Sequence, residues 1–254
     1  MLNFELYNPV RIIFGPGEAE NIGKYTKEYG TKAMLVTYDV HDFFNELLAK
    51  LDKSFKDAGV TVTEFFKVKP NPRLSDIEEA IDICRKEGIE VIVALGGGSV
   101  MDSAKAIGAG VKYDGDPWKM FVSRHDKAVA VPPTDTLPTI MIPTKSATSS
   151  ETNNVAVATN DRTHEKAYIW APVLYPKICV MDPCVTATLP KFPMAAGAVD
   201  AMSHVLEAYL NGDQNSPVQD RCHEGLLMAV MDLIRKIFKD PDDIQARASL
   251  QWAS

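Results

Sequence analysis

Residues 89–95 form an almost wholly apolar run that ends directly on Gly96-Gly97-Gly98-Ser99. Such a run is typical of a strand that is buried on both faces of a parallel sheet. If a helix follows the glycines, its first backbone amides are bare, and the positive end of its dipole can hold a pyrophosphate. The same residues can also form a tight structural turn, since their spacing is not that of the GxGxxG fingerprint.

Strand-like and helix-like segments alternate on both sides of this run. The stretch 42–58 has apolar residues at three- and four-residue intervals and is followed by Gly59, which predicts an amphipathic helix. Ser75, with Glu78 three residues later, predicts a capping box for a helix that runs to residues 87–88. Further strands are predicted at residues 32–37, 60–68, 137–142, 155–159 and 178–181, with an irregular excursion at 114–138. This alternation is typical of an α/β fold in which helices cover a parallel sheet.

The chain changes character near residue 188. From Met194 onward it has helical periodicity and no strand-like run, so we expect one domain over residues 1–188 and a helical one over 189–254. Asp240-Pro241 predicts the start of a last helix, with a capping Asp and Pro at the first helical position. That helix would stop at Ser254 on apolar residues. Either this last helix packs on earlier elements of the chain or the helical domain is incomplete, and we expect an incomplete domain.

Composition argues against several classes of protein. The chain has 27 Lys and Arg against 34 Asp and Glu, a net charge of −7, so its overall field will not hold nucleic acid. It has no signal-like N-terminus and no run of about 18 apolar residues, so we expect a cytoplasmic protein without a membrane span. Irregular spacing predicts reduced, mostly packed thiols for its four cysteines, Cys84, Cys179, Cys184 and Cys222.

Two further sets of residues could carry chemistry. Asp39 follows the predicted strand 32–37, where an acidic residue can accept hydrogen bonds from an adenosine ribose, although a solvated loop Asp has the same pattern. Asp200 and His204 are four residues apart on a predicted helix, so both side chains leave the same face. Such a pair suits Fe²⁺ or Zn²⁺, or forms a surface ion pair. The other histidines have no spacing that completes a ligand set: His41, His125, His164 and His223.

Several motifs follow one another along the chain: residues 8–15, the Pro70-Asn71-Pro72 loop, residues 96–102 with Lys105, residues 113–118, residues 175–177 and 181–183, and the helical stretch 199–204. This ordered series covers essentially the whole chain. It resembles the iron-containing alcohol dehydrogenase family, and within it the butanol dehydrogenases.

This resemblance implies a doubly wound, Rossmann-like dinucleotide-binding domain, followed by the start of an all-α domain with the metal in the cleft between them. Asp200 and His204 match the first two metal ligands, and two further histidines are expected beyond residue 254. The pyrophosphate loop is matched by Gly97, Gly98 and Ser99. Positions that line the cofactor groove are matched by Asn71, Asp102, Thr144 and Lys166.

The implied activity is that of an alcohol/aldehyde oxidoreductase, in which a metal acts as a Lewis acid on the substrate oxygen and hydride passes to or from a nicotinamide ring. Asp200 and His204 would serve catalysis through that metal, either Fe or Zn. The carboxylate of Asp39 favours NAD over NADP. A small alcohol or aldehyde is the expected substrate, and we expect a homo-oligomer, namely a dimer.

Two other functions stay open. One is a glycerol dehydrogenase or dehydroquinate synthase of the same superfamily, against which the match at residues 113–118 argues. The other is a nucleotide-binding fragment without catalysis. The chain also departs from the family twice, because Ser149 stands where a glycine usually precedes the Ser-Glu pair, and Lys145 replaces an uncharged residue. Both departures are expected to affect the nicotinamide side of the pocket.

Overall fold

A six-stranded, entirely parallel sheet forms the centre of the computed structural model, which describes residues 3, 5–40, 42–124, 130–211 and 216–254. Its strand order confirms the doubly wound α/β fold, because the chain runs outward from β2 to β3, crosses back to β4 and then runs outward in the other direction through β5 to β8. In spatial order the strands are β1 (Arg11–Phe14), β8 (Ile178–Met181), β5 (Thr139–Pro143), β4 (Val91–Gly96), β2 (Lys32–Tyr38) and β3 (Thr61–Val68). β4 is buried along its whole length, as its apolar sequence predicts.

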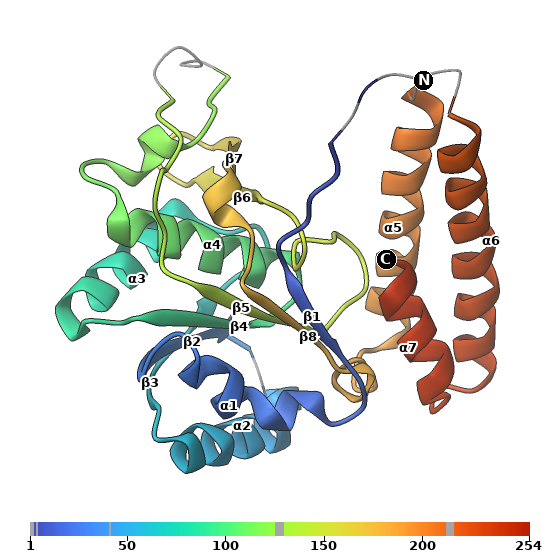
Figure 1. Ribbon diagram of the computed structural model, residues 1–254, viewed down its shortest axis with the longest axis horizontal. Coiled ribbons are helices and arrows are strands. Elements are labelled where there is room, and N and C mark those ends of the chain that lie inside the picture. The colour runs from blue at the N-terminus through green and yellow to red at the C-terminus, as the bar shows by residue number, and fades with distance from the viewer. Residues whose placement is uncertain (1–2, 4, 41, 125–129, 212–215) are drawn as a thin grey trace.

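Helices cover both faces of this sheet (Figure 1). On one face lie α1 (Ile22–Lys27) and α2 (Asn45–Ala58), and their apolar side chains share a core with β2, β4 and β5. On the other face lie α3 (Leu74–Glu87) and α4 (Gly98–Lys112), which form a second core with the opposite faces of the same strands. Gly59 ends α2 in the left-handed conformation (φ 69°), as predicted from its position after the apolar pattern.

Two strands went unrecognised in the sequence. β7 (Glu165–Trp170) pairs antiparallel with β6 (Val155–Asn160) in a hairpin outside the main sheet, and β1 extends the main sheet at its edge. In β7 only Ala167 and Ile169 are buried, while aromatic residues occupy two of its exposed positions. The predicted irregular segment at 114–138 contains one short 3₁₀ helix (Pro117–Met120), and its residues 125–129 lie outside the described ones.

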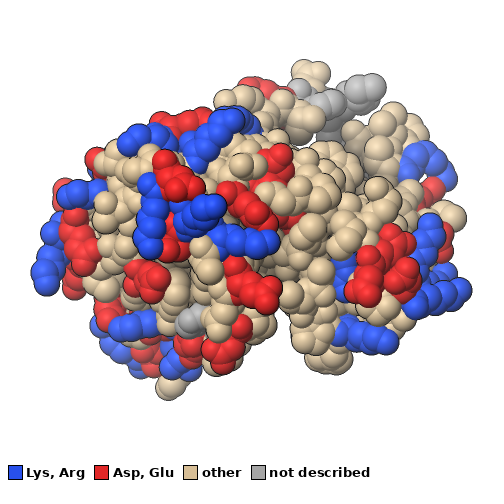
Figure 2. Space-filling model, turned by 90° about the horizontal axis from the view of Figure 1, so that it is seen from below, with Lys and Arg blue, Asp and Glu red and all other residues tan. Residues whose placement is uncertain are grey.

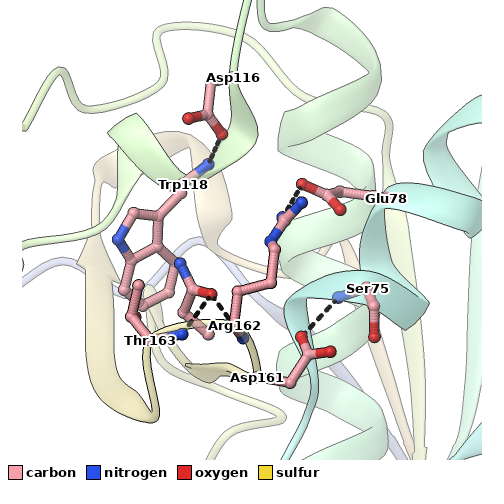
Figure 3. Close-up of polar contacts among 8 residues, drawn as sticks. Ser75, Glu78, Asp116, Trp118, Asp161, Arg162 and Thr163 are labelled. Carbon is pink, nitrogen blue, oxygen red and sulfur yellow. Dashed lines mark hydrogen bonds and ion pairs between the residues drawn. The ribbon is translucent and has the colours of Figure 1, made fainter.

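The capping box predicted at Ser75 and Glu78 is wrong. α3 begins at Leu74, so Ser75 lies inside the helix, and the N-cap Arg73 makes no side-chain capping bond. Instead, the β6–β7 turn caps the helix, since the backbone N–H of Ser75 donates to Asp161 Oδ1 at 3.1 Å and Arg162 pairs with Glu78 (Figure 3). The Glu78 carboxylate therefore faces another segment of the chain.

Among the described residues from Lys191 onward, the structure has three helices: α5 (Lys191–Asn211), α6 (Pro217–Lys239) and α7 (Ile244–Ala253). α5 and α6 lie side by side, and α7 packs across α6 with Ala246 and Leu250 buried (Figure 1). The predicted start of the last helix at Asp240-Pro241 is wrong, because Asp243 is the N-cap and accepts from the N–H of Ala246 at 2.8 Å. The apolar face of α7 docks on earlier elements, except that Trp252 is 63% exposed and touches Phe14 edge-on.

Thiols and surface charge complete the description. All four cysteines are free, but only Cys84 and Cys179 are buried, so the expected packing holds for two of them. Lys, Arg, Asp and Glu side chains are interspersed over the face seen in Figure 2, which fits the small net negative charge. Within the described residues, no helix is both long enough and apolar enough to cross a membrane.

Candidate functional site

The carboxyl ends of β2, β4 and β5 meet at one edge of the sheet. Gly97 follows β4 and is the N-cap of α4, and its N–H donates to the hydroxyl of Tyr38 at the end of β2, at 2.9 Å. On the other side, the N–H of Thr144 donates to the carbonyl of Gly96 at 3.1 Å. The Gly-Gly-Gly-Ser run is thereby fixed as a strand-to-helix turn, and Thr144 is buried beside it.

Side chains at the glycines of this turn would meet close neighbours. None of the three has a positive φ, but a Cβ on Gly97 would lie 3.0 Å from Tyr38 Oη, and one on Gly98 would lie 2.9 Å from Thr148 Oγ1. In the part of the chain that the structure describes, no acceptor bonds the N–H of Gly98 or Ser99. The turn is therefore a cradle that presents backbone donors at a helix N-terminus, and it fits a phosphate group.

Asn71, Ser99 and Lys166 lie together on one side of the cradle, although they come from three separate elements. The N–H of Asn71 donates to Ser99 Oγ at 3.3 Å, and Lys166 Nζ donates to Asn71 Oδ1 at 3.4 Å. Asn71 adopts the left-handed conformation (φ 62°), which Asn tolerates better than most residues. Asn71 and Lys166 are exposed, so their polar groups are accessible to a ligand bound at the cradle.

Asp102 belongs to a buried polar network one turn into α4. Its Oδ1 accepts from Ser150 Oγ at 2.6 Å and its Oδ2 accepts from the N–H of Val157 at 3.0 Å, so both carboxylate oxygens bind protein. Burial raises the pKa of Asp102, against the opposing effect of Lys105. The Asp102 carboxylate therefore helps to hold in place the segment after β5, residues 144–154.

Lys105 is the centre of this network and was singled out in the sequence only as part of a motif. It is fully buried, and its Nζ donates to Ser150 Oγ, Asn153 Oδ1 and the carbonyl of Val155 at 2.9–3.0 Å. Burial lowers the pKa of Lys105 to about 8. The sequence signal was a lysine between Ala104 and Ala106, in a run of small and apolar residues from 104 to 111.

Asp39 lies at the same edge of the sheet. Its backbone N–H donates to the carbonyl of Val68 at 3.1 Å, while its side chain is exposed. The preceding residue, Tyr38, is the one that contacts Gly97. The structure thus brings Asp39 to the side of the cradle where the chain leaves β2.

Asp200 and His204 lie on α5, with Oδ1 and Nε2 3.9 Å apart and their side chains 45% and 56% exposed. Both donors can reach one cation, but within the described ranges no group of three or more His, Cys, Asp or Glu side chains could hold a metal. His41 and His125 lie outside the described residues. His164 is exposed on the β6–β7 turn, and His223 packs edge-on to Tyr209.

The segment after β5 joins the cradle to this helix. A Cβ on Gly197 of α5 would lie 2.3 Å from the carbonyl oxygen of Ser146, so only glycine permits this contact. Gly197 is one turn before Asp200. α5 thus touches the segment after β5 at Gly197, and the same segment lies beside the cradle. The Asp200–His204 pair begins one turn further along α5.

The two departures from the family pattern both lie in this segment. Ser149 takes the left-handed conformation (φ 49°) where glycine is usual, and its hydroxyl donates to the carbonyl of Ser254 at 2.6 Å. Lys145 is half-buried between Gly97 and Gly197. The backbone thus keeps the shape that a glycine favours at residue 149, while Lys145 adds a charge.

Comparison with known proteins gives consistent results along the chain. Residues 9–183 match the family model described as iron-containing alcohol dehydrogenase, and residues 194–254 match the C-terminal model of the Fe-containing alcohol dehydrogenase family. The chain is 39% identical over 257 residues to the probable NADH-dependent butanol dehydrogenase 1 of Bacillus subtilis, covering 99% of this chain and 64% of that protein. It is 37% identical to NADH-dependent butanol dehydrogenase A of Clostridium acetobutylicum, covering 100% and 64%.

A solved structure agrees with these matches. The crystal structure of NADH-dependent butanol dehydrogenase A from Thermotoga maritima superposes with a TM-score of 0.91 at 38% identity, covering 99% of this chain and 62% of that one. The chain spans about 64% of the length of the curated relatives it matches. Because the family model matches residues 9–183, well over half of the sequence, this chain belongs to the iron-containing alcohol dehydrogenase family.

Proposed function

We propose that this chain binds NAD(H) at the cradle of β4 and α4 and forms part of a metal-dependent alcohol/aldehyde oxidoreductase. One observation carries the proposal: the two free amides at Gly98 and Ser99 and the Asp200–His204 pair flank the same segment after β5. A dinucleotide site and a metal site so placed would bring hydride donor and substrate together.

Different residues in and beside the cradle would bind different parts of the cofactor. The amides of Gly98 and Ser99 would donate to the pyrophosphate, and Gly96 and Gly97 leave the space that it needs. The carboxylate of Asp39 would accept from the adenosine ribose. The groove beside them would be lined by Asn71, Thr144 and Lys166, and held in shape by Asp102.

Asp200 and His204 would supply two donors to a divalent cation. A carboxylate oxygen and an imidazole nitrogen suit Fe²⁺ or Zn²⁺, and both side chains are free to turn toward one ion. Such a metal, when bound, supplies a Lewis acid for a carbonyl or alkoxide oxygen. The protein contributes mainly by positioning the two reactants.

The substrate we propose is a small alcohol or its aldehyde. The names of the B. subtilis, C. acetobutylicum and T. maritima relatives, all NADH-dependent butanol dehydrogenases, support this class and support NADH as the cofactor. We also propose a dimer of identical subunits and a division into domains over residues 1–188 and 189–254. The two family models, which end at residue 183 and begin at residue 194, support that division.

Two measurements, made one after the other, test this function. NADH fluorescence is first titrated with the chain, and NADH oxidation is then followed with a short straight-chain aldehyde and added Fe²⁺ or Zn²⁺. We expect saturable NADH binding and metal-dependent turnover. Binding without turnover would instead favour a nucleotide-binding module without catalysis. The finding that no three or more His, Cys, Asp or Glu side chains among the described residues could together hold a metal supports this second function. A chain that does not bind NADH would contradict both.

A further inference from the structure

Lys145 lies between the cradle and helix α5. It lies two residues after the end of β5, and its Cβ lies 3.8 Å from the place where a Cβ of Gly97 would be. Its side chain then extends to α5, with Cγ 3.2 Å and Cε 2.7 Å from the place where a Cβ of Gly197 would be. The lysine stem therefore starts beside the cradle and passes over a glycine of α5.

The ammonium of Lys145 has no counter-ion among the residues that the structure describes. The ion pairs and hydrogen bonds found within the described residues include none to its Nζ, although the side chain is half-buried. A partly buried cation loses some hydration, and a hydrogen-bond acceptor, best an anion, compensates this loss when it takes the place of water. The surroundings of Lys145 therefore suit a negatively charged ligand.

We propose that Lys145 is a phosphate-binding residue for the pyrophosphate of the dinucleotide, an inference that rests on the proposed function. The cradle contributes neutral donors, the amides of Gly98 and Ser99, while the nearby Lys166 already donates to Asn71. A pyrophosphate carries two negative charges. Lys145 supplies a cation on the α5 side of the cradle, where it forms a charge-assisted hydrogen bond with a phosphate oxygen.

The geometry favours the cofactor over the substrate as the source of this anion. The lysine stem begins at Gly97, which is the N-cap of α4, and its Cε lies over Gly197, one turn before Asp200, so the ammonium reaches the amides of α4 by turning back from α5. A phosphate held by the first amides of α4 lies within reach of a four-carbon side chain rooted there. An acidic group on the aldehyde is the other source of charge, and the test below separates the two.

The experiment compares Lys145→Met with wild type in equilibrium binding of NADH, with ADP and adenosine as competitors. We expect Lys145→Met to bind NADH and ADP about tenfold more weakly, the loss typical of one charged hydrogen bond. Adenosine, which has no phosphate, should compete equally well in both. The affinity of wild type for NADH should also fall more steeply with salt than that of the variant.

Three further variants serve as controls. Lys112→Met removes the same charge from the exposed far end of α4 and should leave all three affinities unchanged. Lys145→Arg keeps the charge and should retain most ADP binding, while Lys145→Gln replaces Lys145→Met if the latter does not fold. Thermal unfolding of each variant confirms that the folded protein is being compared.

Each outcome decides the proposal. If wild type binds NADH and Lys145→Met binds it equally well, the role of Lys145 is overturned while the proposed function stands. A parallel loss of adenosine affinity would also overturn it, because Lys145 would then act through the shape of the site. A wild-type chain that binds neither NADH nor ADP overturns the proposed function, and this inference with it.

Discussion

Thr148 stands directly over Gly98: a Cβ built on the glycine would lie 2.9 Å from Thr148 Oγ1 and 3.1 Å from its Cγ2. Gly98→Val should therefore fill the cradle and push a pyrophosphate away from the α4 amides. We expect NADH affinity to fall roughly tenfold or more, since charged hydrogen bonds are lost. The free energy of unfolding should fall by only about 1 kcal/mol, because φ at this residue suits any side chain and the threonine can shift.

Gly225→Val is the matched control for this substitution. Gly225 also lies in a helix, α6, but nothing lies within 4 Å of its Cβ position. NADH affinity should be unchanged in this variant. If folded Gly98→Val binds NADH as tightly as wild type does, the pyrophosphate does not bind at this turn.

The cap of α3 gives a second prediction. Asp161→Ala removes the acceptor for the N–H of Ser75, so the free energy of unfolding should fall by about 1 kcal/mol, the usual loss for a helix cap. Ser75→Ala should lower the free energy of unfolding by less, because the backbone N–H of residue 75 still donates to Asp161. Asp161→Asn keeps an acceptor oxygen and should retain most of the stability. Urea unfolding of the three variants checks this order. A larger loss of stability for Ser75→Ala than for Asp161→Ala would instead support the capping box predicted from the sequence.

This cap also marks the limit of local sequence patterns. The spacing of Ser75 and Glu78 fits a capping box, but the actual acceptor is 86 residues away on the β6–β7 turn. At the last helix, Asp240-Pro241 and Asp243 are both good caps, and only the packing of α6 against α7 selects the second. A local pattern lists the residues able to cap, while tertiary contacts decide which one does.

The strands follow the same logic. β4 was recognisable because both of its faces are buried and its run is apolar throughout. β7 was not, since Tyr168 and Trp170 on its exposed face hide the alternation with Ala167 and Ile169. The cradle was predictable for a similar reason, because glycines that directly follow a buried strand are a local signal. The polar network around Lys105 was not predictable, since the three acceptors of its ammonium lie 45 to 50 residues away.

Lys105 should make stability depend on pH. Its pKa is lowered to about 8 by burial, from 10.5, so between these values the unfolded chain binds more protons than the folded one. The free energy of unfolding should therefore rise with pH from about 8 to 10.5, by up to about 1.4 kcal/mol per pH unit. This stability is present in full above 10.5 and is lost as pH falls through 8.

Lys105→Met isolates this contribution in urea unfolding at several pH values. Tyr25 and Cys84, whose pKa values are raised to about 12 mainly by burial, act with the opposite sign but equally in both proteins. Only the difference between wild type and variant should rise over pH 8 to 10.5. A constant difference would mean that the ammonium of Lys105 keeps its ordinary pKa in the folded chain.

Asp200 and His204 should bind a divalent cation weakly in this 254-residue chain. They are two donors, whereas protein zinc sites usually have three or four protein ligands, so water must complete the shell. Isothermal titration with Zn²⁺ should show weak binding that His204→Ala abolishes and that His164→Asn, on the distant β6–β7 turn, leaves unchanged. Stoichiometric metal that survives dialysis against a chelator would contradict this expectation.

Asp39 should set the choice between NADH and NADPH. Its carboxylate can accept from the 2′-hydroxyl of NADH, but it repels the 2′-phosphate of NADPH by about 4 kcal/mol per unit charge at 4 Å near a surface. Salt and side-chain rotation reduce this repulsion, because the residue is exposed. We expect wild type to prefer NADH and Asp39→Gly to bind NADPH more tightly than wild type does, as measured by titration of both cofactors.

Asp39→Asn separates charge from hydrogen bonding in this choice. The amide keeps an oxygen acceptor for the ribose but removes the negative charge, so NADPH affinity should rise while most NADH affinity is kept. Asp39→Gly removes both, and should therefore lose NADH affinity as well as gain NADPH affinity. Because Tyr38 fixes the end of β2 through its bond to Gly97, neither substitution should disturb the cradle itself. If wild type binds NADPH as tightly as NADH, the side chain of Asp39 does not face the ribose.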